Sequence, residues 1–100
     1  MIKYTVIKNM CSISYARRLE MTNTMPICFI DGKDIWFTVP INIKGKKSVV
    51  PHREDGPAKI YEYDGLYMIE LYYWYGVLAT DNEEFYDPNW RKKIEMDLFL

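Results

Sequence analysis

The sequence predicts an α+β fold, a mainly antiparallel β-sheet of about five or six strands arranged as hairpins, with a C-terminal amphipathic helix. Asp-Gly pairs recur between apolar stretches, and they favour chain reversal because Asp bonds its own backbone and Gly tolerates positive φ. The stretches between them alternate and are rich in β-branched and aromatic residues, which is typical of half-buried strands. The whole chain, residues 1–100, is short enough to form one small domain.

The N-terminal quarter predicts a strand and then a short helix. Residues 2–8 alternate between two faces and favour a strand. In residues 14–21, Tyr15 and Leu19 share one side of a helix while charged residues face water. A short helix is therefore expected here, with a second strand as the alternative.

The next segment predicts a hairpin followed by a lysine-rich stretch. A strand over 27–30 is turned by Asp31-Gly32 and returns over 34–39. Pro40 is expected to stop the return strand because proline cannot donate to a ladder. Residues 42–48 are interpreted as a loop or a short edge strand, where lysines discourage edge-to-edge pairing.

A second hairpin is predicted around Asp64-Gly65. Residues 58–63 favour a strand that begins after Pro57, and the turn leads into residues 66–75, the longest apolar stretch of the chain. Only Glu70 interrupts its two apolar faces. This pattern predicts a central strand, covered on one side by a helix and partly covered on the other.

The C-terminal segment predicts a capped helix. Residues 81–85 are expected to form a loop or a single turn, and Asp87 resembles an N-cap followed by Pro88 at the first helical position. The predicted helix spans 88–98, or 87–98 with its cap. Its apolar stripe, expected to close over the sheet, consists of Trp90, Ile94 and Leu98. Burial of the indole predicts that Trp90→Ala costs several kcal/mol of stability.

A resemblance appears in the middle of the chain. Residues 52–58 read His-Arg-Glu-Asp-Gly-Pro-Ala, residues 63–65 read Tyr-Asp-Gly, and residues 73–76 read Tyr-Trp-Tyr-Gly. Together, over residues 51–78, they resemble one unit of the MORN-like repeats of bacteriophage and giant-virus proteins. Residues 31–37 resemble a weaker first unit. The resemblance implies a small β architecture and a viral origin, and it implies no catalytic residues; unlike a usual array, this chain has one good box.

Composition argues against several classes of function. Thirteen basic and fourteen acidic residues nearly cancel, so nucleic-acid binding is not favoured. Cys11 and Cys28 are too few for a disulfide scaffold and have no metal-ligand spacing, so buried thiols are expected. The first residues do not resemble a signal peptide, and no apolar run is long enough to cross a membrane. The expected location is the host cytoplasm.

The sequence gives little support to an enzyme. His52 is the only histidine, and a general base would require Glu54 or Asp55 to orient it. No nucleophile, phosphate loop or metal motif accompanies it, so no cofactor is expected. His52 is more simply a hydrogen-bonding residue at a turn, and Arg53 is expected to pair with Glu54 or Asp55 and brace that turn, with phosphate contact as its alternative.

The surplus of aromatic residues directs attention to binding. Nine tyrosines and three tryptophans suit half-exposed strands and also suit interaction surfaces. The candidate partner-binding residues, expected on one outer face, are Trp36, Tyr61, Tyr63, Tyr72 and Trp74. The candidate anion contacts are Arg53, Lys46 and Lys47.

Three functional hypotheses follow from these features. The first is a non-enzymatic phage accessory protein that binds a bacterial host protein and inhibits host defence, as an anti-CRISPR or other anti-defence factor. The second is a binder that sequesters a nucleotide, with an aromatic ring on the base and a basic residue on phosphate. The third is a minor structural viral protein. A homodimer through an exposed strand edge is a further hypothesis, because a single repeat unit leaves its neighbour's surface uncovered.

Overall fold

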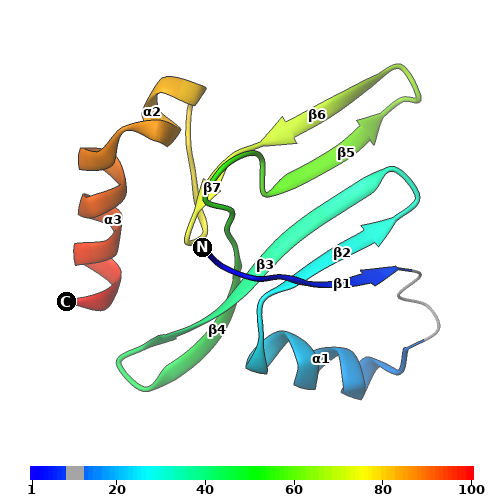
Figure 1. Ribbon diagram of the computed structural model, residues 1–100, viewed down its shortest axis with the longest axis horizontal. Helices are drawn as coiled ribbons and strands as arrows, with labels where there is room; N and C mark the ends of the chain where they lie inside the picture. The colour runs from blue at the N-terminus through cyan, green and yellow to red at the C-terminus, as the bar shows by residue number, and fades with distance from the viewer. Residues whose placement is uncertain (9–12) are drawn as a thin grey trace.

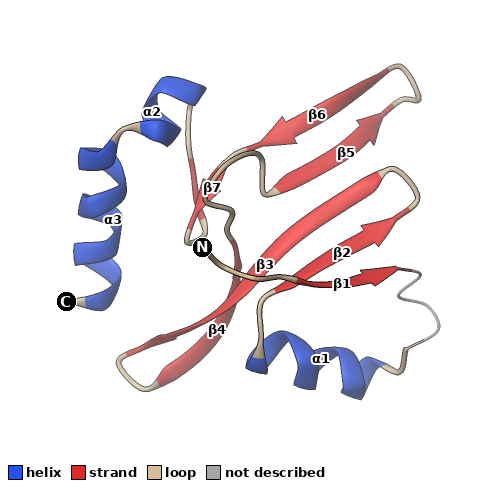
Figure 2. Cartoon of the chain, viewed as in Figure 1, coloured by secondary structure: helices blue, strands red, loops and turns tan. Residues whose placement is uncertain are grey.

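The computed structural model describes residues 1–8 and 13–100 (Figures 1 and 2). Its elements, in chain order, are β1 (Thr5–Lys8), α1 (Tyr15–Thr24), β2 (Ile27–Asp31), β3 (Asp34–Ile43), β4 (Lys46–Pro51), β5 (Lys59–Tyr63), β6 (Tyr67–Leu71), β7 (Tyr73–Trp74), β8 (Val77–Leu78), α2 (Asn82–Tyr86) and α3 (Pro88–Phe99). The α+β class and the C-terminal helix are confirmed.

The main sheet has six strands. Its order is β1-β2-β3-β5-β6, with β4 paired to the far part of β3. All neighbouring pairs are antiparallel except β1 and β2, which run parallel because α1 carries the chain back between them. Strands β7 and β8 form a separate two-stranded hairpin that the sequence pattern did not indicate.

Strand β3 passes through a proline. The expectation that Pro40 ends the strand is wrong, because β3 continues to Ile43 and Pro40 pairs with Val49 of β4. Pairing with β2 has already ended at Thr38, so this part of β3 has one ladder neighbour, and proline is tolerated where a strand side carries no ladder. The lysine-rich segment therefore splits into a Lys44-Gly45 turn and a strand from Lys46 onward.

The long apolar run over residues 66–75 is not one central strand. It divides at Tyr72 into β6, which lies at the edge of the main sheet, and β7, which belongs to the small hairpin. The chain leaves the sheet here, and Tyr72, Trp74 and Tyr75 pack in one core with the C-terminal helices. The apolar run thus combines an edge strand that belongs to neither core with a hairpin that the helices cover.

Helix α1 confirms the short helix predicted over residues 14–21. Ser14 caps it, since its hydroxyl oxygen accepts a hydrogen bond from the backbone N–H of Arg17 at 3.2 Å. The helix and its C-terminal end cover the first part of the sheet. Their contacts form a core of Ile7, Ile27 and Phe29, with Ile13, Met21 and Met25 packed against it.

The C-terminal helices build a second core. Asp87 caps α3 as predicted, accepting a hydrogen bond from the N–H of Asn89 at 2.9 Å. The stripe faces inward, yet it closes over the β7–β8 hairpin and not over the main sheet, as the position of α3 beside β7 in Figure 1 indicates. This core consists of Trp74, Phe85 and Ile94, with Tyr72, Tyr75, Ala79, Trp90 and Leu98 packed against it.

Two further sequence expectations concern membranes and thiols. None of the helices in the described part of the chain has the length and apolar character needed to cross a membrane. Cys28 is buried in β2, and burial raises the pKa of its thiol. Cys11 lies outside the described residues.

Candidate functional site

One face of the main sheet carries most of the aromatic residues of β3, β5 and β6. Strand register places Trp36 opposite Phe29 on one side and Lys59 on the other. Tyr61 lies opposite Ile69, and Tyr63 lies opposite Tyr67. Partners in an antiparallel ladder share a face of the sheet. We call the following set the aromatic face: Trp36, Lys59, Tyr61, Tyr63, Tyr67, Ile69 and Leu71.

The aromatic face is open to solvent. Trp36 is 46% exposed, Tyr63 is 48% exposed and Tyr67 is 55% exposed. Helix α1 lies on the same face, where it packs over Ile7, Ile27 and Phe29 of β1 and β2 and lines a cleft with Trp36 of β3. Neither buried core includes a residue of β5 or β6. Figure 1 shows the β5–β6 hairpin extending away from all three helices. Large aromatic side chains thus lie side by side without a covering layer.

A lysine is placed among these rings. The Nζ atom of Lys59 lies 5.6 Å from the ring centroid of Trp36 and 5.4 Å from that of Tyr73. Contacts of this length between an ammonium and an aromatic ring are attractive because the ring face is electron-rich. Further along, the Tyr63 and Tyr67 rings lie 5.5 Å apart. The face is therefore ordered by its own contacts although it is uncovered.

Two of the five predicted partner-binding residues lie elsewhere. Trp74 is only 8% exposed and is the centre of the second core, and Tyr72 packs against the same core. The expectation that they share an outer face with Trp36 is wrong, because the chain leaves the sheet at Tyr72. Trp36, Tyr61 and Tyr63 do lie together. Tyr67, which adds to them, was assigned to a strand face without being recognised as part of this surface.

The His-Arg-Glu-Asp-Gly-Pro-Ala segment, residues 52–58 and hereafter the box, begins with a fully buried histidine. The Nδ1 atom of His52 accepts a hydrogen bond from the N–H of Tyr75 at 2.8 Å, and the two rings stack at 3.9 Å. Burial lowers the pKa of His52 to about 4, with nearby Arg91 acting in the same direction and Glu54 opposing it. Protonation at Nδ1 would also remove the acceptor. His52 is therefore the hydrogen-bonding residue that the sequence suggested, placed in the interior.

The second box residue braces the turn without an ion pair. The Nη1 atom of Arg53 donates to the carbonyl of Pro57 at 3.2 Å, and its guanidinium lies 4.2 Å from the ring centroid of Phe37. The predicted pairing of Arg53 with its acidic neighbours is not found among the described residues. Gly56 has φ of +127°, and a Cβ there would lie 3.0 Å from the Arg53 Cζ. The glycine is required by both its conformation and the packed arginine.

The two acidic box residues bond the N-terminal segment and helix α2. The Glu54 carboxylate accepts a hydrogen bond from the N–H of Ile2 at 2.7 Å. The Asp55 carboxylate accepts one from the hydroxyl of Tyr86 at 3.1 Å. Arg91 of α3 donates to the Glu54 carbonyl at 3.1 Å and lies 4.1 Å from the Trp74 ring centroid. Every polar box side chain thus has a structural contact.

The predicted anion contacts are not brought together. Lys46 is exposed beside the turn of the β3–β4 hairpin, with Lys47 next to it, whereas Arg53 follows the other end of β4. An extended strand from Lys46 to Pro51 spans roughly 17 Å at about 3.3 Å per residue. Arg53 is also already engaged with Pro57 and Phe37. These three residues do not form one phosphate site.

The larger pockets are poorly suited to phosphate or metal. A pocket of ≈ 300 Å³ beside the box contains Arg53 together with Glu54 and Asp55. Another, of ≈ 450 Å³ and located between β6 and α2, contains Glu70 and Asp81 and no basic residue. Carboxylates repel phosphate in both places. Within the described ranges, no three His, Cys, Asp or Glu residues are grouped to hold a metal ion.

Comparison with known proteins adds no further assignment. The chain matches no protein-family model, and no curated protein or solved structure matches it. The resemblance to MORN-like repeats therefore stays a prediction from the box and the residues that follow it.

Proposed function

We propose that this chain is a non-enzymatic protein-binding module, a phage accessory protein that binds a bacterial host protein and inhibits host defence, as an anti-CRISPR or other anti-defence factor. The observation that carries the proposal is the uncovered aromatic face, on which Trp36, Tyr63 and Tyr67 are each about half exposed. The viral origin and host setting come from the resemblance of the box to MORN-like repeats.

The aromatic face has the composition of a binding surface. Tyrosine and tryptophan are enriched where proteins bind one another, since each ring offers a large apolar area with few rotatable bonds and a polar atom for a hydrogen bond. The energy of such interfaces is concentrated in a few residues of these types. Adjacent exposed rings on an ordered sheet, here Trp36 beside Lys59 and Tyr63 beside Tyr67, offer such a concentrated area.

The box supports a role without bond-making chemistry. His52 is buried, has a neutral imidazole at physiological pH, and accepts its hydrogen bond from the Tyr75 backbone. Glu54 and Asp55 are hydrogen-bonded to Ile2 and Tyr86 and not to the histidine. A general base needs an accessible, oriented imidazole with a pKa near the working pH. The side chains that a general base would need are thus engaged in hydrogen bonds with Ile2, Tyr75 and Tyr86.

The test compares variants of the aromatic face in capture from bacterial lysate. The double variant Trp36→Thr/Tyr63→Thr keeps residues that favour strands and removes both rings. Met96→Thr, which alters an exposed apolar residue of α3, is the control. We expect a captured host protein to be lost from the double variant, with Kd rising about 30-fold or more for each ring that acts as a hot spot.

Two results would contradict the proposal. One is capture of the same partner by the double variant and by the native chain with equal affinity. The other is the absence of any host protein captured by the native chain above the level seen with an unrelated protein of similar charge. The mass of the purified protein in solution should be measured in parallel, because β6 is an edge strand and a homodimer through it would cover part of the same region.

A further inference from the structure

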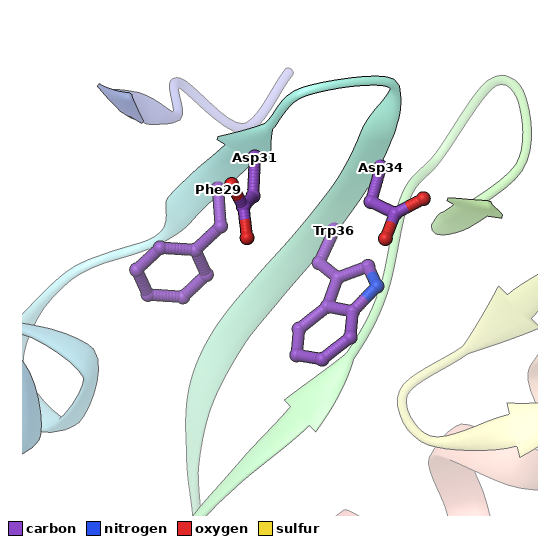
Figure 3. Close-up of a pocket in the computed structure, with 4 residues that line it drawn as sticks. All are labelled: Phe29, Asp31, Asp34 and Trp36. Carbon is purple, nitrogen blue, oxygen red and sulfur yellow. The ribbon is translucent and has the colours of Figure 1, made fainter. Parts of the chain in front are cut away.

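A small pocket lies where the aromatic face meets the β2–β3 turn (Figure 3). It has a volume of ≈ 80 Å³ and is lined by Phe29, Asp31, Asp34 and Trp36. The register of β2 and β3 pairs Phe29 with Trp36 and Asp31 with Asp34, so all four side chains project from one face of the sheet. Figure 3 shows the Asp31 carboxylate beside the Phe29 ring and the Asp34 carboxylate beside the Trp36 indole.

Neither carboxylate of the pocket is paired with a cation in the part of the chain that the structure describes. Like charges directly opposite one another on paired strands repel. Lys33, between them in the turn, has its Nζ atom 3.5 Å from the Glu62 carboxylate. Among the described residues, neither Asp31 nor Asp34 forms an ion pair; Asp34 only accepts the Glu62 N–H at 3.3 Å. Lys59 contacts the Trp36 ring at 5.6 Å from its centroid but does not line this pocket. On the pocket side, a tryptophan beside negative charge is an environment that favours a cation.

We propose that this pocket binds the guanidinium group of an arginine presented by the partner protein. The inference rests on the proposed protein-binding function and names the chemistry of the partner's anchoring residue. A guanidinium stacks flat on an indole and donates paired hydrogen bonds to carboxylates, so it satisfies both Trp36 and the two aspartates. At about 15 Å³ per water, the pocket holds roughly five waters, which is comparable to the size of this head group.

A neighbouring cleft extends the site for the rest of the side chain. It has a volume of ≈ 170 Å³, shares Phe29 and Trp36 with the pocket, and is otherwise lined by Tyr15, Arg18, Leu19 and Thr22 of α1. Its aromatic and aliphatic side chains suit the aliphatic stem of arginine, whereas Arg18 adds a positive charge to the lining, so the guanidinium is assigned to the pocket between the aspartates and not to this cleft. Other ligand classes fit less well: phosphate is repelled by both carboxylates, and a divalent cation requires more oxygen ligands than this pair offers.

The test uses N-acetyl-arginine amide as the probe and its neutral isostere N-acetyl-citrulline amide as the comparison. Titration into isotope-labelled protein is followed by NMR of the backbone amides of residues 31–36 and the Trp36 indole N–H. We expect saturable binding of the arginine probe with Kd on the order of 1 mM. Asp31→Asn should weaken it about tenfold, because a charge-assisted hydrogen bond is lost.

Asp64→Asn is the matched control for this variant. It makes the same charge change at an exposed hairpin turn, between β5 and β6, and Asn tolerates the φ of +54° found there. We expect binding of the arginine probe to be unchanged in this variant, and the spectra show directly that each variant is folded.

The outcomes separate this inference from the proposed function. Equal binding of the citrulline probe, or equal binding of the arginine probe by the Asp31→Asn and native proteins, would overturn the arginine pocket. If a host protein is nevertheless captured and its binding depends on Trp36 and Tyr63, the protein-binding function stands without it. Binding of the arginine probe with the expected charge dependence supports the pocket even where no host protein is captured.

Discussion

Aromatic side chains are buried around the β7–β8 hairpin and exposed on the aromatic face. Around the β7–β8 hairpin, Trp74 is 8% exposed and Phe85 is fully buried, because α2 and α3 cover them. On the aromatic face, Trp36 and Tyr63 are nearly half exposed and neither belongs to a buried core, although α1 lines a cleft beside Trp36. Aromatic content alone therefore does not distinguish a core from a surface. The presence or absence of a second layer does.

The covered end also holds polar contacts between distant segments, although the buried His52 Nε2 and Trp74 Nε1 atoms have no hydrogen-bond partner. Arg91 joins α3 to the rest of the chain by hydrogen bonds to the carbonyls of Phe85, at 2.6 Å, and Glu54, at 3.1 Å, and by its stacking on Trp74. The open end instead has a carboxylate pair at its border that is not matched by a cation among the described residues. The covered end therefore contributes a packed core, whereas the open end carries two carboxylates that form no ion pair within the described residues.

The largest expected effect is at the centre of the covered end. Phe85→Ala should lower the free energy of unfolding by about 3–5 kcal/mol, because it leaves a cavity in contact with Trp74 and Ile94. Trp90, for which the sequence predicted a loss of this kind, is only partly buried, so Trp90→Ala should cost less than Phe85→Ala. Urea unfolding of both variants and the native protein measures which substitution lowers the free energy of unfolding more. A smaller loss for Phe85→Ala than for Trp90→Ala would break the comparison.

Local chemistry explains which parts of the fold the sequence could predict. The Asp31-Gly32 and Asp64-Gly65 turns and the Asp87 cap depend on a few neighbouring residues, and all three are found. Residues 66–75 could not be resolved in the same way, because an apolar run has the same pattern whether it is a central strand or an edge strand followed by a separate hairpin.

The sequence predicted only the part of the candidate site that depends on local strand alternation. Trp36, Tyr61 and Tyr63 share a face because strand alternation is a local rule, whereas the burial of Trp74 depends on where α2 and α3 pack. The contact of Arg91 with the box joins residues far apart in the chain, and only the folded structure brings them together. No sequence pattern indicated that contact.

A smaller effect is expected from the buried histidine. The unfolded chain binds a proton on His52 with a pKa near 6.5, whereas the native state holds it neutral until about pH 4. The unfolded state therefore binds more protons within this window. The free energy of unfolding should be at its full value above pH 6.5 and should fall by about 1 kcal/mol between pH 6.5 and 5.5.

The variant His52→Phe checks that this loss comes from the histidine. Phenylalanine keeps a ring against Tyr75 and cannot titrate, although the Tyr75 N–H then lacks its acceptor. The variant should be less stable at neutral pH and nearly independent of pH between 6.5 and 5.5. Since His52 is the only histidine, an unchanged slope in the variant would show that the buried imidazole is not the source of the pH dependence.

The smallest change in stability is expected for substitutions on the aromatic face. It tests most directly whether the exposed rings contribute less to stability than the buried rings of the covered end. Trp36→Thr and Tyr63→Thr should each change the free energy of unfolding by only about 0.5 kcal/mol, because the rings are half exposed and threonine favours strands. Urea unfolding at neutral pH measures this. A loss of several kcal/mol would mean that the rings stabilise the sheet as the covered end does. If stability is kept, these residues are free to serve a partner, since the fold does not depend on them.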